Sequence, residues 1–164
     1  MAPVSNTCSL AAPAMRRSGA KGFTLIELMT TVFVAAILLT IATPSFRDFI
    51  LGQRTKTAAY DLASALLYAR SEAVKRNTSV AVTPATGGWQ NGWTVTAGAS
   101  VLSAHEAFPG LTVTGPAGGL VYNSSGRLAA VINPFSISAT NSTATSQCVN
   151  VDLSGQPTST MGSC

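Results

Sequence analysis

An apolar run of about 21 residues, from Phe23 to Thr43, holds a single charged residue, Glu27. As a helix, a run of this length rises about 30 Å, which is enough to cross the hydrocarbon core of a membrane. Only basic charges precede the run, so the positive-inside rule predicts a cytoplasmic N-terminus and an exported C-terminal part. A carboxylate at membrane depth is costly and usually has a function. The run therefore predicts a transmembrane helix at residues 23–43 with a functional acid near one end.

A cleaved secretory signal peptide is the alternative interpretation of this run. The apolar core of such a signal is about 7–15 residues long, and a cleavage site of small residues follows it. Here the run is longer and continues into sequence that is compatible with a helix. The length therefore favours an anchor that stays on the protein.

The stretch KGFTLIEL, from Lys21 to Leu28, combines a basic residue, a glycine, an aromatic residue and an acid at a fixed place in an apolar helix. This pattern resembles the type IV pilins and the type II secretion pseudopilins. Three further stretches, ALLYARSEAVKRN, GGWQNGW and HEAFPG, resemble the GspH/FimT/FimU minor pilin (pseudopilin) branch more narrowly. The resemblance implies an α+β, type IV pilin-like fold, in which a long N-terminal α-helix (membrane anchor plus soluble half) packs on an antiparallel β-sheet.

The resemblance also implies how the N-terminus is processed. Residues 1–22 would be a leader peptide that a prepilin peptidase removes by cutting between Gly22 and Phe23, with N-methylation of Phe23. The new amine of a neighbouring subunit could pair with Glu27, which offsets part of the cost of desolvating both charges. Before assembly the chain would be a single-pass protein of the bacterial inner membrane, in contact with its lipid, with a periplasmic C-terminal domain.

Pro44 follows the apolar run and removes one helical hydrogen bond, so the sequence predicts a helix kink there. The alternative is that the helix ends at Thr43. Beyond the proline, apolar residues recur at steps of three and four: Ala59, Leu62, Ala63, Leu66, Ala69 (or Arg70) and Ala73. Charged residues, Glu72 among them, fall mostly outside this stripe. The pattern predicts one long helix from about Phe23 to Arg76, whose soluble half covers residues 44–77.

Short segments rich in valine and threonine replace the helical pattern after Asn77. They are SVAVT, GWTVTA, LTVTG, GLVYN, RLAAVI, FSISA and CVNVDL, separated by Gly, Pro, Asn and Ser. This composition predicts antiparallel strands in a β-rich head at residues 78–164, with the sheet covering the apolar stripe of the helix. Trp89 and Trp93 flank a predicted turn, and we expect both to pack in the core or at its rim.

Two of the three cysteines, Cys148 and Cys164, lie in the part that is expected to be exported, where disulfides persist, whereas Cys8 lies in the leader. A bridge between Cys148 and Cys164 would close a C-terminal disulfide loop. The resembled family often carries a bridge of this kind. Two free thiols are the alternative.

No pattern in the sequence points to catalysis. His105 is the only histidine, and no GxSxG or ordered Ser–His–Asp signature accompanies it. No CxxC spacing or His/Cys cluster indicates a metal site, so no metal or other cofactor is expected. We interpret His105 as a surface or packing residue and expect that the protein is not an enzyme.

Basic charge matters because some FimT proteins of the resembled branch bind DNA. Removal of the leader with its three basic residues would lower the net charge from +4 to +1. Beyond Arg76 the only basic residue is Arg127, whereas DNA binding needs clustered Lys and Arg. The glycine-arginine motif of the DNA-binding members has no match, since glutamine follows Gly155. DNA binding through Arg127 is therefore disfavoured.

The sequence thus predicts a non-enzymatic minor pilin that helps to prime assembly and to form the tip of a type IV pilus. Its expected partners are the prepilin peptidase and other minor and major pilins or pseudopilins. A minor pseudopilin of a type II secretion system and a DNA receptor of natural transformation are the alternatives, and a major pilin is a further one.

Overall fold

The computed structural model describes residues 22–140 and 142–164, without the side chains of residues 41–45. The predicted leader, with Cys8, lies outside these residues except for Gly22. The chain divides into two compact units, Met1–Leu39 and Thr40–Cys164.

One α-helix, α1, runs from Leu25 to Arg76 and belongs to both units. Because the helix continues through Pro44, the alternative in which it ends at Thr43 is wrong. Proline removes one N–H donor, and the helical sequence on both sides keeps the other hydrogen bonds of the helix. The kink at Pro44 stays a prediction.

Most of the transmembrane helix predicted at residues 23–43 lies within α1. Within the described residues, no helical stretch is both long and apolar enough to cross a membrane.

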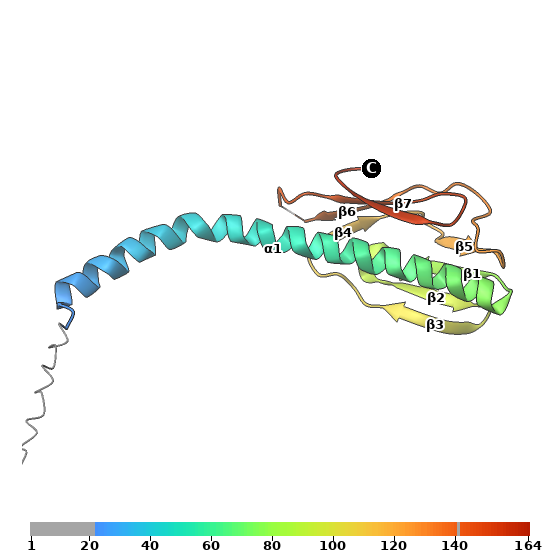
Figure 1. Ribbon diagram of the computed structural model, residues 1–164, viewed down its shortest axis with the longest axis horizontal. Coiled ribbons are helices and arrows are strands. Elements are labelled where there is room, and N and C mark those ends of the chain that lie inside the picture. The colour runs from blue at the N-terminus through green and yellow to red at the C-terminus, as the bar shows by residue number, and fades with distance from the viewer. Residues whose placement is uncertain (1–21, 141) are drawn as a thin grey trace, which may run out of the picture. The chain divides into compact units, whose positions relative to one another are not determined.

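The second unit adds eight strands within residues 78–140 and 142–164. They are β1 (Val80–Pro84), β2 (Trp93–Ala97), β3 (Ser100–His105), β4 (Leu111–Thr114), β5 (Leu120–Tyr122), β6 (Phe135–Ala139), β7 (Gln147–Val151) and β8 (Pro157–Met161), with a short 3-10 helix, η1 (Trp89–Asn91), before β2. The strands form two antiparallel sheets rather than one, in the orders β3-β2-β1-β5 and β4-β6-β7-β8. Both sheets lie along the second half of α1 (Figure 1).

The apolar stripe of α1 forms one side of the core, as predicted. Ala59, Leu62, Leu66, Ala69 and Ala73 are all buried, and Ala63 packs at the edge of the same cluster. The inward-facing side chains of both sheets complete the core, among them Val80, Val82, Val95, Tyr122, Phe135, Ile137, Val149 and Val151. Buried and less buried residues alternate along β1, β2, β4, β5 and the start of β6, because successive side chains of a strand point to opposite faces.

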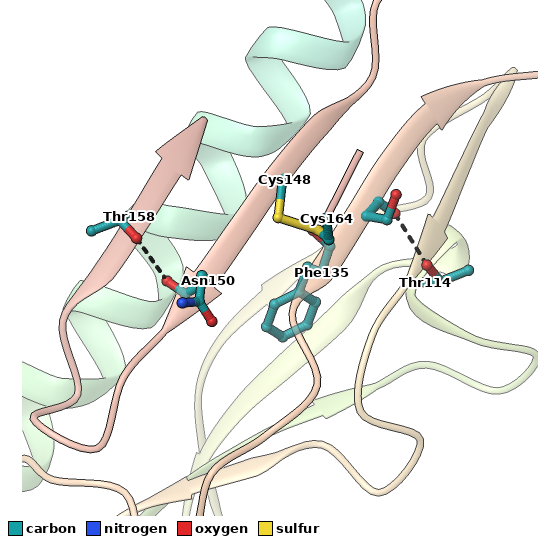
Figure 2. Close-up of a disulfide and its surroundings, with 7 residues drawn as sticks. Thr114, Phe135, Cys148, Asn150, Thr158 and Cys164 are labelled. Carbon is teal, nitrogen blue, oxygen red and sulfur yellow. Dashed lines mark hydrogen bonds between the residues drawn. A yellow bond between two sulfur atoms is a disulfide. The ribbon is translucent and has the colours of Figure 1, made fainter. Parts of the chain in front are cut away.

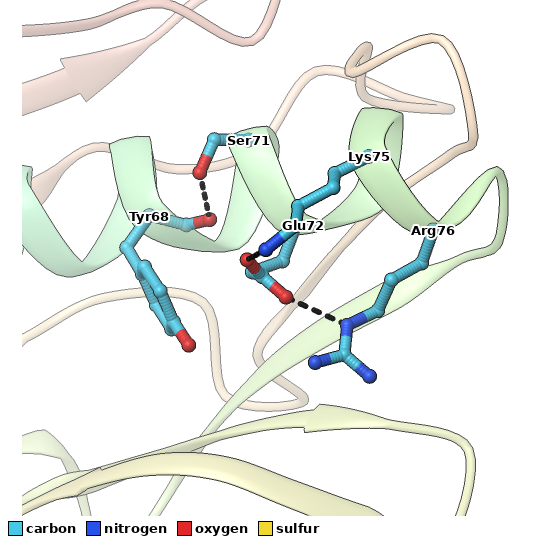
Figure 3. A network of polar contacts seen from close by, with 5 residues as sticks. All are labelled: Tyr68, Ser71, Glu72, Lys75 and Arg76. Atoms are coloured by element: carbon cyan, nitrogen blue, oxygen red, sulfur yellow. Dashed lines mark hydrogen bonds and ion pairs between the residues drawn. The ribbon is translucent and has the colours of Figure 1, made fainter.

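Glu72 departs from the predicted charge pattern, because its side chain is buried beside the stripe. Arg76 Nε donates to Glu72 Oε2 at 2.6 Å, and Lys75 Nζ donates to Oε1 at 3.4 Å (Figure 3). The hydrogen bond from Arg76 lowers the pKa of the Glu72 carboxyl more than burial raises it, and Lys75 lowers it further. The carboxylate is thus kept charged although it is shielded from water.

One strand prediction was wrong, and two strands were missed. The stretch RLAAVI forms no strand, since only Leu128 makes a β-bridge there, to Tyr122. Strands β3 and β8 were not predicted. Both are edge strands whose side chains are mostly exposed, so neither shows the apolar alternation of a half-buried strand.

Candidate assembly surface

The first turn of α1 carries the predicted functional acid. Glu27 is the third helical residue, and its backbone N–H donates to Thr24 Oγ1 at 3.3 Å. Thr24 is therefore the N-cap, and Thr24-Leu25-Ile26-Glu27 matches the sequence of a capping box. An acid in the first turn also interacts favourably with the helix dipole. Sequence reasoning missed this local role, although the Thr-x-x-Glu spacing was readable.

The surface around Glu27 is apolar and open. Every large apolar side chain of α1 from Leu25 to Leu39 is at least 48% exposed. Phe23 precedes the helix and is exposed as well, and among the described residues no atom lies within 4 Å of the place that a Cβ on Gly22 would take. An apolar helix surface of this extent is typical of a site that another molecule covers.

The C-terminal disulfide is confirmed. Cys148 in β7 is bonded to Cys164, with their Cα atoms 5.1 Å apart (Figure 2). Gly162 N donates to Ser146 O at 2.8 Å, so the segment after β8 is also held by a backbone hydrogen bond to the residue just before β7. The bridge thereby fixes this tail against the outer side of the second sheet.

The two tryptophans pack in the core, as predicted. Trp89 Nε1 donates to Pro116 O at 3.0 Å, and its ring lies edge-on to Phe135 at 4.8 Å. Trp93 stacks on the ring of His105, with the ring centres 4.4 Å apart.

His105 is a packing residue that also makes polar contacts. Its ring packs against Trp93 and Phe108, with ring centres 4.4 and 4.6 Å away, and those two rings also contact each other at 5.4 Å. Nδ1 lies 2.8 Å from Glu106 O, and Nε2 lies 3.7 Å from Asp61 Oδ2 on α1. Because a carbonyl oxygen only accepts, Nδ1 is the donor in the first contact. With Nδ1 as a donor, the contact with Asp61 joins the end of β3 to the helix as an ion pair when Nε2 is protonated as well.

Two arginines of the second unit, Arg127 and Arg70, differ in their contacts. Arg127 is exposed in the turn after β5, where Asn123 Oδ1 accepts a hydrogen bond from its backbone N–H. Arg70, in contrast, donates to Gly126 O at 3.0 Å and to Gln156 Oε1 at 3.2 Å. Among the described residues, no group of His, Cys, Asp and Glu could hold a metal ion.

A further contact of α1 was not predicted. The carboxylate of Asp48 accepts hydrogen bonds from Ser142 Oγ at 2.7 Å and from Thr143 Oγ1 at 3.1 Å. The loop between β6 and β7 is thus held to the helix by an acid that lies more than 90 residues earlier in the sequence. No local pattern in the sequence predicts a contact between residues so far apart.

A long N-terminal helix that packs on two antiparallel sheets, with an exposed apolar first part bearing one acid, defines the class of pilin-like subunits. Within that class, the chain belongs to the family described as type II transport protein GspH, which it matches over residues 58–155. Residues 17–43 match the prokaryotic N-terminal methylation motif. Both matches agree with the GspH/FimT/FimU branch that the sequence motifs indicate.

Solved structures support the fold. The type IV minor pilin FimU of Pseudomonas aeruginosa in one crystal form gives a TM-score of 0.58 at 23% sequence identity, and the match covers 65% of this chain and 87% of FimU. A second crystal form of FimU gives a TM-score of 0.57, again at 23% identity, with 64% and 91% covered. Comparison with curated proteins found no match.

Proposed function

We propose that the protein is a non-enzymatic minor pilin that helps to prime the assembly of a type IV pilus and to form its tip. The observation that carries this proposal is the exposed apolar surface of α1 between Leu25 and Leu39, whose only charge is Glu27. Burial of such a surface against other helices releases free energy at about 25 cal/mol per Å². In a filament this apolar surface would be buried against other subunits, whereas in a water-soluble monomer it would stay exposed to water.

The proposal includes processing and location. A prepilin peptidase cuts between Gly22 and Phe23 and Phe23 is methylated, which the match to the methylation motif supports. Until assembly, residues 23–43 anchor the chain in the inner membrane among its lipids, with the N-terminus in the cytoplasm and the head in the periplasm.

Glu27 then has two roles, one local and one between subunits. In the free helix it lies in the capped first turn, near the N–H groups that lack intrahelical partners. In the filament it pairs with the amine on Phe23 of a neighbouring subunit. Away from water such pairing offsets the desolvation of both charges, so an unpaired subunit is at a disadvantage.

The experiment that tests this proposal separates the two roles. Glu27→Gln keeps the size and the capping ability of the side chain but removes its charge. We expect this variant, like Glu27→Ala, to enter filaments at least tenfold less than wild type, whereas Glu27→Asp retains part of the incorporation. Incorporation is measured by immunoblotting of sheared filaments, with membrane levels of each variant as the control. Wild-type incorporation of Glu27→Gln would sink the pairing role.

A minor pseudopilin of a type II secretion system is the second candidate, and the description of the matched family favours it. Deletion of the gene discriminates between the two machines. Loss of surface pili with normal secretion of exoproteins supports the pilus, and the opposite result supports the secretion system. A DNA receptor is not proposed, because Arg127 is the only basic residue from 77 to 164.

A further inference from the structure

Strand β8 forms one edge of the second sheet, where β7 is its only neighbour. Among the described residues, no backbone hydrogen bond engages β8 outside its ladder with β7. The other three edges are less open. A register shift against β2 makes the pairing of β3 irregular, β5 makes a further β-bridge from Tyr122 to Leu128, and η1 packs against β4. The outer side of β8 is therefore the most accessible edge of the head.

The ladder between β7 and β8 determines which backbone groups of β8 point outward. In an antiparallel pair, opposite residues alternate between those that exchange hydrogen bonds and those whose N–H and C=O groups point away from each other. Gly162 N donates to Ser146 O at 2.8 Å, and these two residues continue the register of the ladder. Every second pair from there is thus hydrogen-bonded. The backbone groups that point away from β7 belong to the residues in between, which are Pro157, Ser159 and Met161.

This outer side carries little that would prevent a further strand from pairing with it. Pro157 lacks an N–H group, but its position at the start of the strand leaves the N–H groups of Ser159 and Met161 and three carbonyl groups available. Natural edge strands often carry lysine or another charged residue that blocks pairing. No side chain from Leu153 to Cys164 is charged. The edge therefore presents an unprotected row of donors and acceptors.

A pocket adjoins the end of β8. It has a volume of about 300 Å³, and its lining includes Phe49, Gly52 and Lys56 of α1, Ala144 of the loop between β6 and β7, and Met161. The two large apolar side chains of this lining are open, with Phe49 59% and Met161 68% exposed. Directly opposite residues of paired strands lie on the same face of a sheet. A strand paired with β8 would therefore place its residue opposite Met161 beside the pocket.

We propose that β8 accepts an extended strand of another polypeptide chain, which carries a large apolar side chain opposite Met161. Backbone hydrogen bonds to Ser159 and Met161 hold this strand, and the pocket selects its side chain, as in other cases where a peptide adds a strand to a sheet edge. This contact lies in the head and is separate from the exposed apolar surface between Leu25 and Leu39.

A second copy of the chain does not fit as the occupant. Arg70 contacts Gln156 just before β8, whereas Gly52 and Lys56 lie beside Met161 at its end, so α1 runs antiparallel to β8. A two-fold dimer that pairs two β8 strands is antiparallel, and it would point the soluble halves of the two α1 helices in opposite directions. Under the proposed function, both helices start from the same membrane, which disfavours this dimer.

Site-specific photo-crosslinking of the full chain, in the bacterium that makes it, tests the proposal. The photoreactive residue p-benzoylphenylalanine replaces Thr160, which is exposed on β8, or, as a control, Val131, which is 77% exposed in the loop between β5 and β6. We expect Thr160 to crosslink to an extended segment of another protein. Ser159→Pro, which removes an outward N–H but no backbone bond to β7, should lower this crosslink fivefold or more, whereas Ser159→Ala should leave it unchanged.

A second pair of variants tests the pocket. A Cβ on Gly52 would lie 4.0 Å from the Cβ of Ala144, so Gly52→Ala fits without displacement. Gly52→Leu extends into the pocket and should lower the crosslink from Thr160 fivefold or more, whereas Gly52→Ala should not. Membrane levels of every variant serve as the control for folding. A crosslink that Gly52→Leu leaves at the wild-type level would overturn the role of the pocket.

Hydrogen exchange of the free full chain in detergent tests the edge itself. We expect the amides of Thr158 and Thr160, which bond to β7, to exchange tenfold or more slowly than those of Ser159 and Met161. Equal exchange of the four amides would overturn the proposal. A crosslink from Thr160 to an α-helix or to β8 of a second copy would do the same, as would no crosslink beyond that from Val131 or one that Ser159→Pro does not weaken. None of these results bears on the incorporation of the chain into filaments through α1.

Discussion

Tyr122 places a phenol in the core of the head, and its replacement by phenylalanine tests how the core tolerates that group. The side chain is fully buried on β5, and among the described residues its hydroxyl has no hydrogen-bond partner. The pKa of Tyr122 is raised from an ordinary value of 10.0 to about 12, because the effect of burial outweighs the lowering by Arg70 and Asp152 adds a smaller increase. The folded protein therefore holds this proton more tightly than the unfolded chain does.

The sign and size of the effect follow from these two pKa values. Because the folded value is the higher one, the stability of the wild type is complete below pH 10 and falls as the pH rises toward 12. At one pKa unit per 1.36 kcal/mol, the loss at pH 11 is about 1.4 kcal/mol. Tyr122→Phe has no such proton, and at pH 7 it also removes a buried unsatisfied hydroxyl. We expect it to be as stable as wild type at pH 7, or up to about 1 kcal/mol more stable.

Urea unfolding followed by circular dichroism at 222 nm, at pH 7, 9 and 11, measures the difference. Both proteins carry Cys8→Ser, because a free thiol exchanges with disulfides at alkaline pH. Tyr60→Phe is the matched control, since Tyr60 is exposed and its replacement should leave the pH dependence unchanged. If the free energies of unfolding of wild type and Tyr122→Phe differ by the same amount at pH 9 and pH 11, the argument from burial is wrong.

Two further predictions concern the head. Cys148→Ser opens a bridge that spans 16 residues, and it should lower the free energy of unfolding by about 3 kcal/mol and speed proteolysis of the tail. Adding Cys164→Ser should cause no further loss of stability. Urea unfolding measures both variants. Gly92→Ala should lower the melting temperature clearly, at a cost of about 2–4 kcal/mol, because its φ is +101° and a Cβ there would meet His105 O. Gly98→Ala is the control, since its φ is also positive but its surroundings are open, and it should cost only about 1–2 kcal/mol.

The helix was predictable because its signal is local and periodic. The steps of three and four from Ala59 to Ala73 fix which side is buried, whatever covers it. The strands of the core were found for the same reason, since Val80 and Val82 alternate with less buried residues. Strands β3 and β8 gave no such signal. An edge strand is held by backbone hydrogen bonds on one side, and those bonds place little demand on its side chains.

The contacts between distant parts of the chain could not be derived from the sequence. Asp48 binds a loop that follows it by more than 90 residues, and Asp61 approaches His105 from another element. Each contact depends on how the sheets lie along α1. The burial of Glu72 was missed for a related reason, because helical position alone gives no sign that Arg76 covers the carboxylate. The disulfide was predictable, since Cys148 and Cys164 are the only two cysteines in the part that the sequence predicts to be exported.

The capped first turn of α1 sharpens what the pairing of Glu27 can contribute to assembly. In water, the hydrogen bond from Glu27 N to Thr24 Oγ1 and the dipole of α1 stabilise the helix end, whether or not a neighbour is present. A free carboxylate at this place therefore carries no penalty in an aqueous environment. The penalty arises only where apolar surroundings exclude water, as between packed helices or in lipid. Under the proposed function, a subunit moves from the lipid of the membrane to the packed helices of the filament. Pairing of Glu27 with a neighbour's amine acts at this step, because it offsets the penalty in the filament. Glu27→Gln should accordingly leave the isolated helix folded while it changes that step.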